Sequence, residues 1–238
     1  MKTTLASLHT WFEALFGSQP ERILYGFAEL EGLLPAELES LPNALSFAVR
    51  MDDLTMDSII TGPTRYYFGE YTRINEFIAG LETKIVGHLT ALGYWAYAIH
   101  PSKRVDFVNI AGEFPHKTAA SLAGLGWIGK NCQLVTPEYG PRVRLGTILT
   151  NMPLGGQAAR RLTSRCGKCT RCADICPAKA LSGTAWTETG GRASLLDAVA
   201  CDLWKQEHFG EFGKGAVCGI CTSICPHGRR GRKTGLAV

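Results

Sequence analysis

The cysteines are the residues of this chain with the most evident chemistry, and eight of the nine lie in its last third. The first run has the spacing C-x2-C-x2-C-x3-C-P and consists of Cys166, Cys169, Cys172 and Cys176. The second run is shorter, is also followed by proline, and consists of Cys218, Cys221 and Cys225, with Cys201 upstream of it. Thiolates in this order are typical ligands of iron–sulfur clusters.

The spacing also predicts which thiolates share a cluster. Three cysteines two residues apart wrap a tight loop around three iron atoms, and the fourth, one helical turn later, faces the neighbouring cluster, as in bacterial two-cluster ferredoxins. Cys201 supplies the ligand that the second run lacks. We therefore assign one [4Fe–4S] cluster to Cys166, Cys169, Cys172 and Cys225 and the other to Cys176, Cys201, Cys218 and Cys221.

Zinc, disulfides and a ninth ligand are the alternatives. Structural zinc prefers four ligands in separated pairs, so a third cysteine two residues on followed by Cys-Pro fits it poorly. Disulfides require an oxidising compartment. Cys132 is isolated from both runs and is expected to be a buried apolar residue.

Composition and charge favour a cytoplasmic globular protein without a membrane segment. Its 238 residues are 45% hydrophobic, and no apolar run approaches the length that spans a bilayer. The first residues lack the apolar stretch of a secretory signal. The net charge of +4 is offset by the charge of two anionic clusters, so nucleic acid is an unlikely partner. The basic residues near the cysteines are counter-charges for the clusters or a solvated tail, or else a docking patch for an acidic electron donor or a phosphate-bearing substrate. They are Arg165, Lys168, Arg171, Lys179, Arg229, Arg230, Arg232 and Lys233.

The front of the chain alternates helical and strand-like patterns. Apolar residues recur every three or four positions over residues 4–16 and 66–92, and Pro115 can open a helix that runs to about Leu122. Strand-like runs cover residues 23–30, 44–51, 94–99, 133–136 and 143–150. The last two flank Pro137-Glu-Tyr-Gly-Pro141 and predict a hairpin, whereas residues 51–64 read as irregular. We expect an α+β chain, with an α/β cofactor-binding domain over residues 1–158 and a ferredoxin-like two-[4Fe–4S] domain over residues 159–238.

A glycine-rich segment, Gly124-Leu-Gly-Trp-Ile-Gly-Lys130, lies in the later part of the first domain. It matches nucleotide-binding motifs literally, but a helix precedes it where a strand is required, and Asn131 replaces the Ser or Thr of the phosphate-binding loop. Its glycines permit close backbone approach to a large ligand, or else form a tight turn packed on the core.

The segment Ala123-Gly-Leu-Gly-Trp-Ile-Gly-Lys-Asn131, the run Leu145-Gly-Thr-Ile-Leu-Thr-Asn151 and the two cysteine runs resemble the epoxyqueuosine reductases, which are related to reductive dehalogenases. The resemblance extends from about Pro115 to His227. It implies a corrinoid (cobalamin) that receives electrons from the two clusters. The residues it implies as corrinoid contacts are Gly124, Gly126, Trp127, Gly129, Lys130 and Asn131.

The chain departs from this family at the expected proton donor. Those enzymes have an Asp-Thr-Ala-Pro segment before the glycine motif, where this chain reads Ala111-Gly-Glu113-Phe-Pro115-His116-Lys117. Glu113, His116 and Lys117 are therefore candidate catalytic acids, although none matches the family motif. The helical-repeat region that helps those enzymes grip transfer RNA is expected to be missing, so a transfer-RNA substrate is doubtful.

Three functions remain. The first is an oxidoreductase in which a donor such as ferredoxin or flavodoxin supplies electrons to the two clusters. The clusters then reduce a corrinoid or another redox cofactor in the front domain, which acts on a small-molecule or unknown substrate. The second is an electron-transfer or reactivation protein with two clusters and no organic active site. The third, resting on the basic tail, is a nucleic-acid binder with structural clusters.

Overall fold

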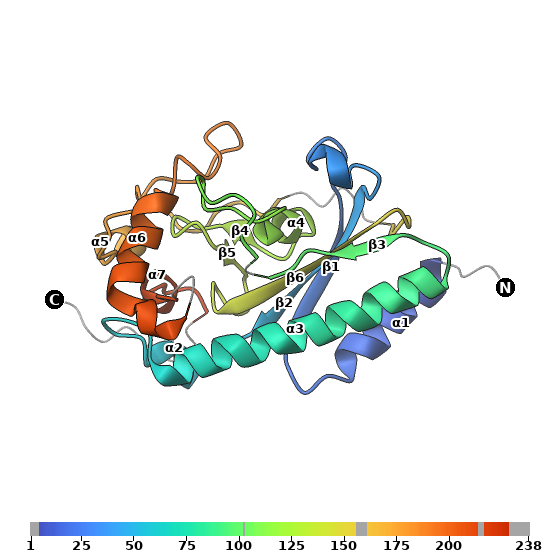
Figure 1. Cartoon of the computed structure of the whole chain (residues 1–238), viewed down its shortest axis with the longest axis horizontal. Helices are drawn as coiled ribbons and strands as arrows, with labels where there is room; N and C mark the ends of the chain where they lie inside the picture. Colours follow the sequence, from blue (N-terminus) through green and yellow to red (C-terminus); the bar gives the residue numbers. More distant parts are fainter. Residues whose placement is uncertain (1–4, 102, 156–160, 214–216, 229–238) are drawn as a thin grey trace. The chain divides into compact units, whose positions relative to one another are not determined.

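The computed structural model describes residues 5–101, 103–155, 161–213 and 217–228, and the basic stretch Arg229 to Lys233 lies outside these ranges. Contacts within the chain divide it into two compact units, whose elements Figure 1 labels. The first consists of Met1–Arg50, Tyr71–Trp127 and Arg144–Thr163, and the second of Met51–Glu70, Ile128–Val143 and Ser164–Val238. The second unit thus includes two segments that precede the boundary expected at residue 158, and that boundary stays a prediction.

The first unit is built on a four-stranded sheet in the order β1-β2-β6-β3 (Figure 1). β1 pairs antiparallel with β2, and β3 pairs antiparallel with β6. The strands are β1 (Ile23–Glu29), β2 (Asn43–Arg50), β3 (Ala96–Ala98) and β6 (Val143–Thr150). The helices associated with them are α1 (Leu5–Gly17), a 3-10 turn (Ala36–Leu38), α3 (Arg65–Ala91) and α4 (His116–Leu122). The part of α3 from Tyr71 onward belongs to this unit.

Helices cover both faces of this sheet. The predicted apolar face of α3 is buried together with α1 and with Phe47 and Ile148 of the sheet. A second core cluster on the other face includes Ala119 of α4, Ala44 of β2 and Leu149 of β6. The mixed helix and sheet class is therefore confirmed, and the sheet holds α4 and the loop before it in place.

The predicted hairpin is wrong. β5 (Leu134–Val135) pairs with β4 (Trp127–Ile128) in a separate two-stranded sheet, while β6 lies between β2 and β3. The turn signal does form a tight turn, since the backbones of Thr136 and Gly140 exchange two hydrogen bonds of 2.9 Å. The strands do not continue from it because residues 146–150 are buried and pair within the large sheet.

The second unit consists mainly of short helices and loops. Besides β5 it contains α2 (Asp53–Asp57), α5 (Arg171–Asp174), α6 (Ala198–Phe209), a 3-10 turn (Gly210–Phe212) and α7 (Ile220–Ser223). α2 lies in the stretch that the sequence predicted as irregular, and the Asp52 side chain caps it by accepting a hydrogen bond from the Thr55 N–H at 2.7 Å. None of the helices in the described ranges is long and apolar enough to cross a membrane.

Glu82 of α3 is an acid buried in the core of the first unit. Its side chain is 4% exposed, and Oε1 has no hydrogen-bond partner among the described residues. Burial raises the pKa of Glu82 to about 8, although a hydrogen bond with the Thr147 backbone opposes the rise. This carboxyl group is therefore largely protonated at neutral pH.

The Glu82→Gln variant is expected to lose a pH dependence of stability. Since the folded-state pKa of about 8 lies above the ordinary value of 4.5, the native protein keeps a proton that the unfolded chain releases. This contribution is complete below the ordinary pKa and is lost as the pH rises through the folded-state pKa, a change of up to about 3–5 kcal/mol. Urea unfolding midpoints between pH 5 and 9 should fall more steeply for the wild type than for Glu82→Gln. Glu76→Gln, at an exposed site of the same helix, is the control, and parallel profiles for wild type and Glu82→Gln would refute the assignment.

Candidate iron–sulfur centre

Two cavities in the second unit are each lined by four cysteines. The first cavity is lined by Cys166, Cys169, Cys172 and Cys225. The second cavity is lined by Cys176, Cys201, Cys218 and Cys221. Each group of four combines cysteines from both parts of the sequence pattern, because Cys225 joins the first group and Cys176 the second. The assignment of each group to one cluster stays a prediction.

Short turns position the cysteines of the first run. The Cys169 N–H donates to the Cys166 carbonyl at 3.0 Å, and Gly167 between them has a φ of +51°, which glycine adopts without strain. α5 follows, and at its end the Cys176 N–H donates to the Ala173 carbonyl at 3.2 Å. One helical turn thus separates Cys172, at the first cavity, from Cys176, at the second.

The remaining ligand candidates lie on or beside α6 and α7. Cys201 lies in the first turn of α6, which Asp197 caps by accepting the Ala200 N–H at 2.9 Å. Trp204 and Lys205 follow one turn later and line the same second cavity. Gly219 has a φ of +80° and precedes α7, which carries Cys221.

Burial disfavours the thiolate form of five of the eight cavity cysteines. Burial raises the pKa of Cys225 to about 11, and burial also raises the pKa of Cys172, Cys201, Cys218 and Cys221. Cysteine binds metals as the thiolate, so ligation here requires nearby positive charge. Iron would supply most of it, and Lys130, Arg171 and His227 line the first cavity, as Lys205 lines the second. The donor set therefore fits iron–sulfur clusters.

Cys132 finds no support as a ninth ligand. Within the described parts of the chain, no group of three or more His, Cys, Asp or Glu side chains is arranged around a metal position, and because this includes the thiols of both cavities it does not distinguish zinc from iron–sulfur clusters. Cys132 is 1% exposed and lines neither cysteine cavity.

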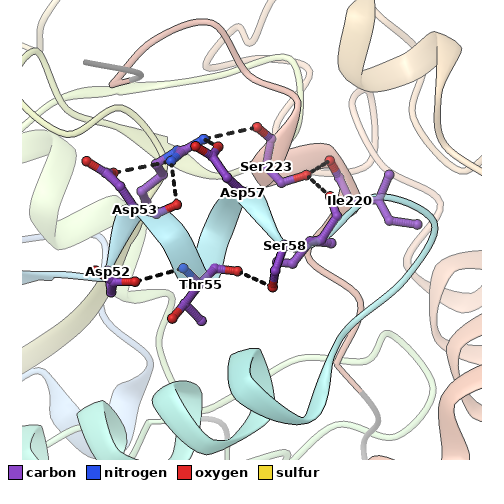
Figure 2. A network of polar contacts seen from close by, with 9 residues as sticks. Asp52, Asp53, Thr55, Asp57, Ser58, Ile220 and Ser223 are labelled. Carbon is purple, nitrogen blue, oxygen red and sulfur yellow. Dashed lines mark hydrogen bonds and ion pairs between the residues drawn. The ribbon is translucent and has the colours of Figure 1, made fainter. Parts of the chain in front are cut away.

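A buried arginine connects α2 to α7 (Figure 2). The Arg142 side chain is 1% exposed and donates to Asp57 Oδ1 at 2.5 Å and to Asp53 Oδ1 at 3.2 Å. It also donates to the Ser223 carbonyl at 3.4 Å, and Ser223 Oγ in turn donates to the Ile59 carbonyl at 3.0 Å. Ser223 lies between Cys221, which α7 carries, and Cys225, which follows the end of α7 by two residues, so this network holds the segment that supplies one cysteine to each group. The sequence did not predict this role of Arg142, because no motif or residue spacing near position 142 indicates it.

The residues predicted to contact a corrinoid have varied surroundings. Gly124 ends α4 with a φ of +76°, and Trp127 is 2% exposed. A Cβ on Gly129 would lie 2.6 Å from Asn131 Oδ1 and from Val135 Cγ2, so this glycine is packed against the protein itself. Lys130 and Asn131 line the first cysteine cavity. Gly126 is buried, and the corrinoid contacts of all six residues stay a prediction.

A further cavity of about 250 Å³ lies in the first unit at the start of α4. His116 is one of its lining residues, together with His100, Lys103 and Arg104, whereas the other catalytic candidates, Glu113 and Lys117, do not line it. Pockets for drug-sized ligands have volumes of about 300–1,000 Å³, so this cavity is close in size to those that hold a small molecule.

The candidate acids differ in protonation. Burial, followed by the charge of Arg144, lowers the pKa of His116 to about 4, and its Nδ1 lies 2.9 Å from Thr147 Oγ1. His116 Nε2 has no hydrogen-bond partner within the described ranges, although the His100 carbonyl is near enough to raise the pKa slightly. For Glu113, burial is outweighed by hydrogen bonds from Tyr97 at 2.9 Å and Lys103 at 3.1 Å, which lower its pKa. At neutral pH His116 is therefore a neutral imidazole and Glu113 a paired carboxylate.

Comparison with known proteins agrees with the cysteine pattern. Residues 165–228 match the family model of the 4Fe-4S double cluster binding domain. Epoxyqueuosine reductase of Gloeobacter violaceus is 34% identical over 176 residues, or 68% of this chain and 52% of the relative. The enzyme of Bacillus anthracis is 33% identical over 134 residues, covering 55% and 34%, and that of Synechocystis is 32% identical over 151 residues, covering 60% and 49%.

Solved structures share the fold. A selenomethionine-labelled epoxyqueuosine reductase superposes with a TM-score of 0.58 at 18% identity, covering 94% of this chain and 66% of that one. A B12-dependent reductive dehalogenase gives 0.68 at 22% identity, covering 87% and 30%. The chain spans about a third to a half of the length of the curated relatives it matches. It is a homologue of the epoxyqueuosine reductases that contains a 4Fe-4S double cluster binding domain, which confirms the resemblance.

Proposed function

We propose, from this homology to the epoxyqueuosine reductases, that the chain is an iron–sulfur oxidoreductase that passes electrons through two [4Fe–4S] clusters to a corrinoid for reductive chemistry. The observation that carries the proposal is the grouping of eight cysteines, four and four, around two cavities of one compact unit. Each cluster takes up and releases one electron at a time, so two of them in one unit form a path for single electrons.

The residues that would hold the clusters are the two groups of four cysteines named above. The first cavity would hold the cluster of Cys166, Cys169, Cys172 and Cys225, and the second that of Cys176, Cys201, Cys218 and Cys221. Lys130 and Arg171 at the first cavity and Lys205 at the second would offset the cluster charge. Ferredoxin or flavodoxin, both acidic low-potential proteins, would be the electron donor, and exposed Arg165, Lys168 and Arg171 offer them a complementary surface.

The corrinoid part of the proposal rests on homology. A bound corrinoid would supply a cobalt ion that the clusters can reduce. The glycine segment is its expected contact, although the Asn131 and Val135 side chains already pack against Gly129. The cavity of about 250 Å³ at the start of α4 would hold the substrate. There the neutral His116 would bind the substrate by a hydrogen bond, and Lys103 would favour a negatively charged group.

Cobalamin binding tests this part. Anaerobically reconstituted protein is expected to change the visible spectrum of added cob(II)alamin in a saturable way, and reduction of the clusters should then reduce the cobalt. The Cys225→Ala protein, which leaves every residue of the first unit unchanged, is the control: it should bind cobalamin but reduce it more slowly. Absence of any spectral change in protein with intact clusters would refute the corrinoid role.

Such a result would favour the second candidate function, an electron-transfer or reactivation protein without an organic active site. The packing of Gly129 against its own turn supports this alternative, because no space opens at that glycine.

One related structure is an epoxyqueuosine reductase with an epoxyqueuosine-modified tRNA stem loop, at 17% identity and a TM-score of 0.56. A structured RNA is therefore the substrate class that competes with a small molecule, and salt-dependent RNA binding would favour it.

A further inference from the structure

Asn131 is the residue that the linings of the two cysteine cavities have in common. Its side chain is 3% exposed, so it lies within the unit and not on its surface. Its neighbours divide between the cavities, since Lys130 lines the first and Gln133 the second. Asn131 therefore occupies the wall between the two groups of cysteines.

The surrounding turn fixes the orientation of the Asn131 amide. Oδ1 accepts the Gln133 N–H at 3.2 Å, and Nδ2 donates to the Cys221 carbonyl at 3.4 Å. An amide that accepts from a backbone N–H with one end and donates to a carbonyl with the other cannot be flipped without losing both bonds. The N–H end is thus directed toward the cysteine-bearing segment of α7.

Two backbone features make room for this side chain. Gly129 has no Cβ, and a Cβ there would lie 2.6 Å from Asn131 Oδ1. Cys132 has a φ of +59° and its N–H donates to the Gly129 carbonyl at 2.8 Å, which closes the turn around Asn131. A non-glycine residue with positive φ is uncommon and is retained where the surroundings require it. These two features at the end of the glycine motif therefore place the Asn131 amide beside both cavities.

We infer that Asn131 sets the reduction potentials of both clusters together, an inference that rests on the two clusters of the proposed function. Reduction adds one electron to a cluster that is already anionic and changes no covalent bond. The Asn131 NH2 group has two hydrogens, of which the Cys221 carbonyl accepts one, and it lies in the wall between the two cavities. This positive end of the amide stabilises the added charge, because hydrogen bonds and dipoles near the sulfurs raise cluster potentials. Lys130 and Gln133 act on one cluster each.

The test is a redox titration of anaerobically reconstituted protein, followed by electron paramagnetic resonance. Asn131→Ala is expected to make both midpoint potentials more negative, whereas Gln133→Ala is expected to shift at most the potential of the cluster held at the second cavity. If Asn131→Ala loses iron, the isosteric Asn131→Asp serves in its place. It keeps the acceptor for the Gln133 N–H, adds negative charge, and should lower both potentials.

The outcomes are separable. Wild-type protein that contains iron, with Asn131 variants that shift neither potential or only one, overturns this inference and leaves the two-cluster function standing. Wild-type protein without iron and sulfide overturns the proposed function itself. Equal shifts of the midpoint potentials in Asn131→Ala and Gln133→Ala would also contradict the inference. Any change in the turn would then alter the potentials, and the effect would not be specific to the Asn131 amide.

Discussion

Alanine at Cys176 is expected to remove about four of about eight iron atoms and to destroy the cluster of the second cavity, although Cys176 belongs to the first run in the sequence. The reason is geometric, since Cys176 lies with Cys201, Cys218 and Cys221 at one cavity. The measurement is iron and sulfide content together with the paramagnetic resonance spectrum of the cluster that remains. The Cys176→Ala spectrum should match that of Cys201→Ala.

Cys225 gives the reciprocal result. Cys225→Ala should leave the same spectrum as Cys169→Ala, because both residues line the first cavity. Cys132→Ala is the matched control and should retain both clusters, since that buried thiol lines neither cavity. A Cys176→Ala spectrum that matches Cys169→Ala instead would show that each run binds its own cluster, contrary to the assignment.

Replacement of Arg142 by methionine is expected to destabilise the second unit by about 2–4 kcal/mol. The substitution keeps much of the side-chain volume but leaves Asp53 and Asp57 without their shared cation and the Ser223 carbonyl without one of its donors. Breaking a fully buried pair costs about 3–5 kcal/mol, and the two carboxylates here are 29% and 31% exposed, so water compensates them in part. The midpoint temperature of thermal unfolding should fall by about 5–10 °C. Iron should also be lost faster, because α7 loses its hydrogen bond from Arg142 to the Ser223 carbonyl.

The control for Arg142 is Arg73, which forms a 2.6 Å ion pair with Glu21 and whose side chain is 52% exposed. Arg73→Met should cost less than about 1 kcal/mol, as exposed pairs do. Arg142→Lys keeps the positive charge but loses the planar guanidinium that donates to two carboxylates and a carbonyl at once. It therefore separates the effect of charge from the effect of hydrogen-bond geometry. Equal stability losses in Arg142→Met and Arg73→Met would refute a structural role for the buried network.

The parts of the fold that could be predicted from the sequence are those in which local pattern and burial agree. The apolar period of residues 66–92 predicted α3, because its repeating Ile and Leu residues pack on the sheet. The hairpin prediction failed because pairing of β6 within the large sheet outweighs the local turn at Pro137. Arg142 was missed because its partners lie more than 80 residues away in the sequence.

At the site, the cysteine pattern predicted residues that the fold indeed brings to two cavities, because ligand spacing is a property of short loops. The surroundings of these cavities were not predictable. Trp204 and Lys205 reach the second cavity through the helical period that follows Cys201, and this is a signal that the sequence does contain. The position of Asn131 depends on a turn closed by Cys132, whose positive φ no sequence pattern announces.

The second unit is proposed to carry electrons through two [4Fe–4S] clusters. The most direct measurement is the iron and acid-labile sulfide content of the wild-type protein, purified without oxygen, together with its visible spectrum. We expect about eight iron and about eight sulfide per chain, with a broad visible absorption that bleaches on reduction. Protein that holds zinc in place of iron, or that contains no sulfide after anaerobic reconstitution, would contradict it.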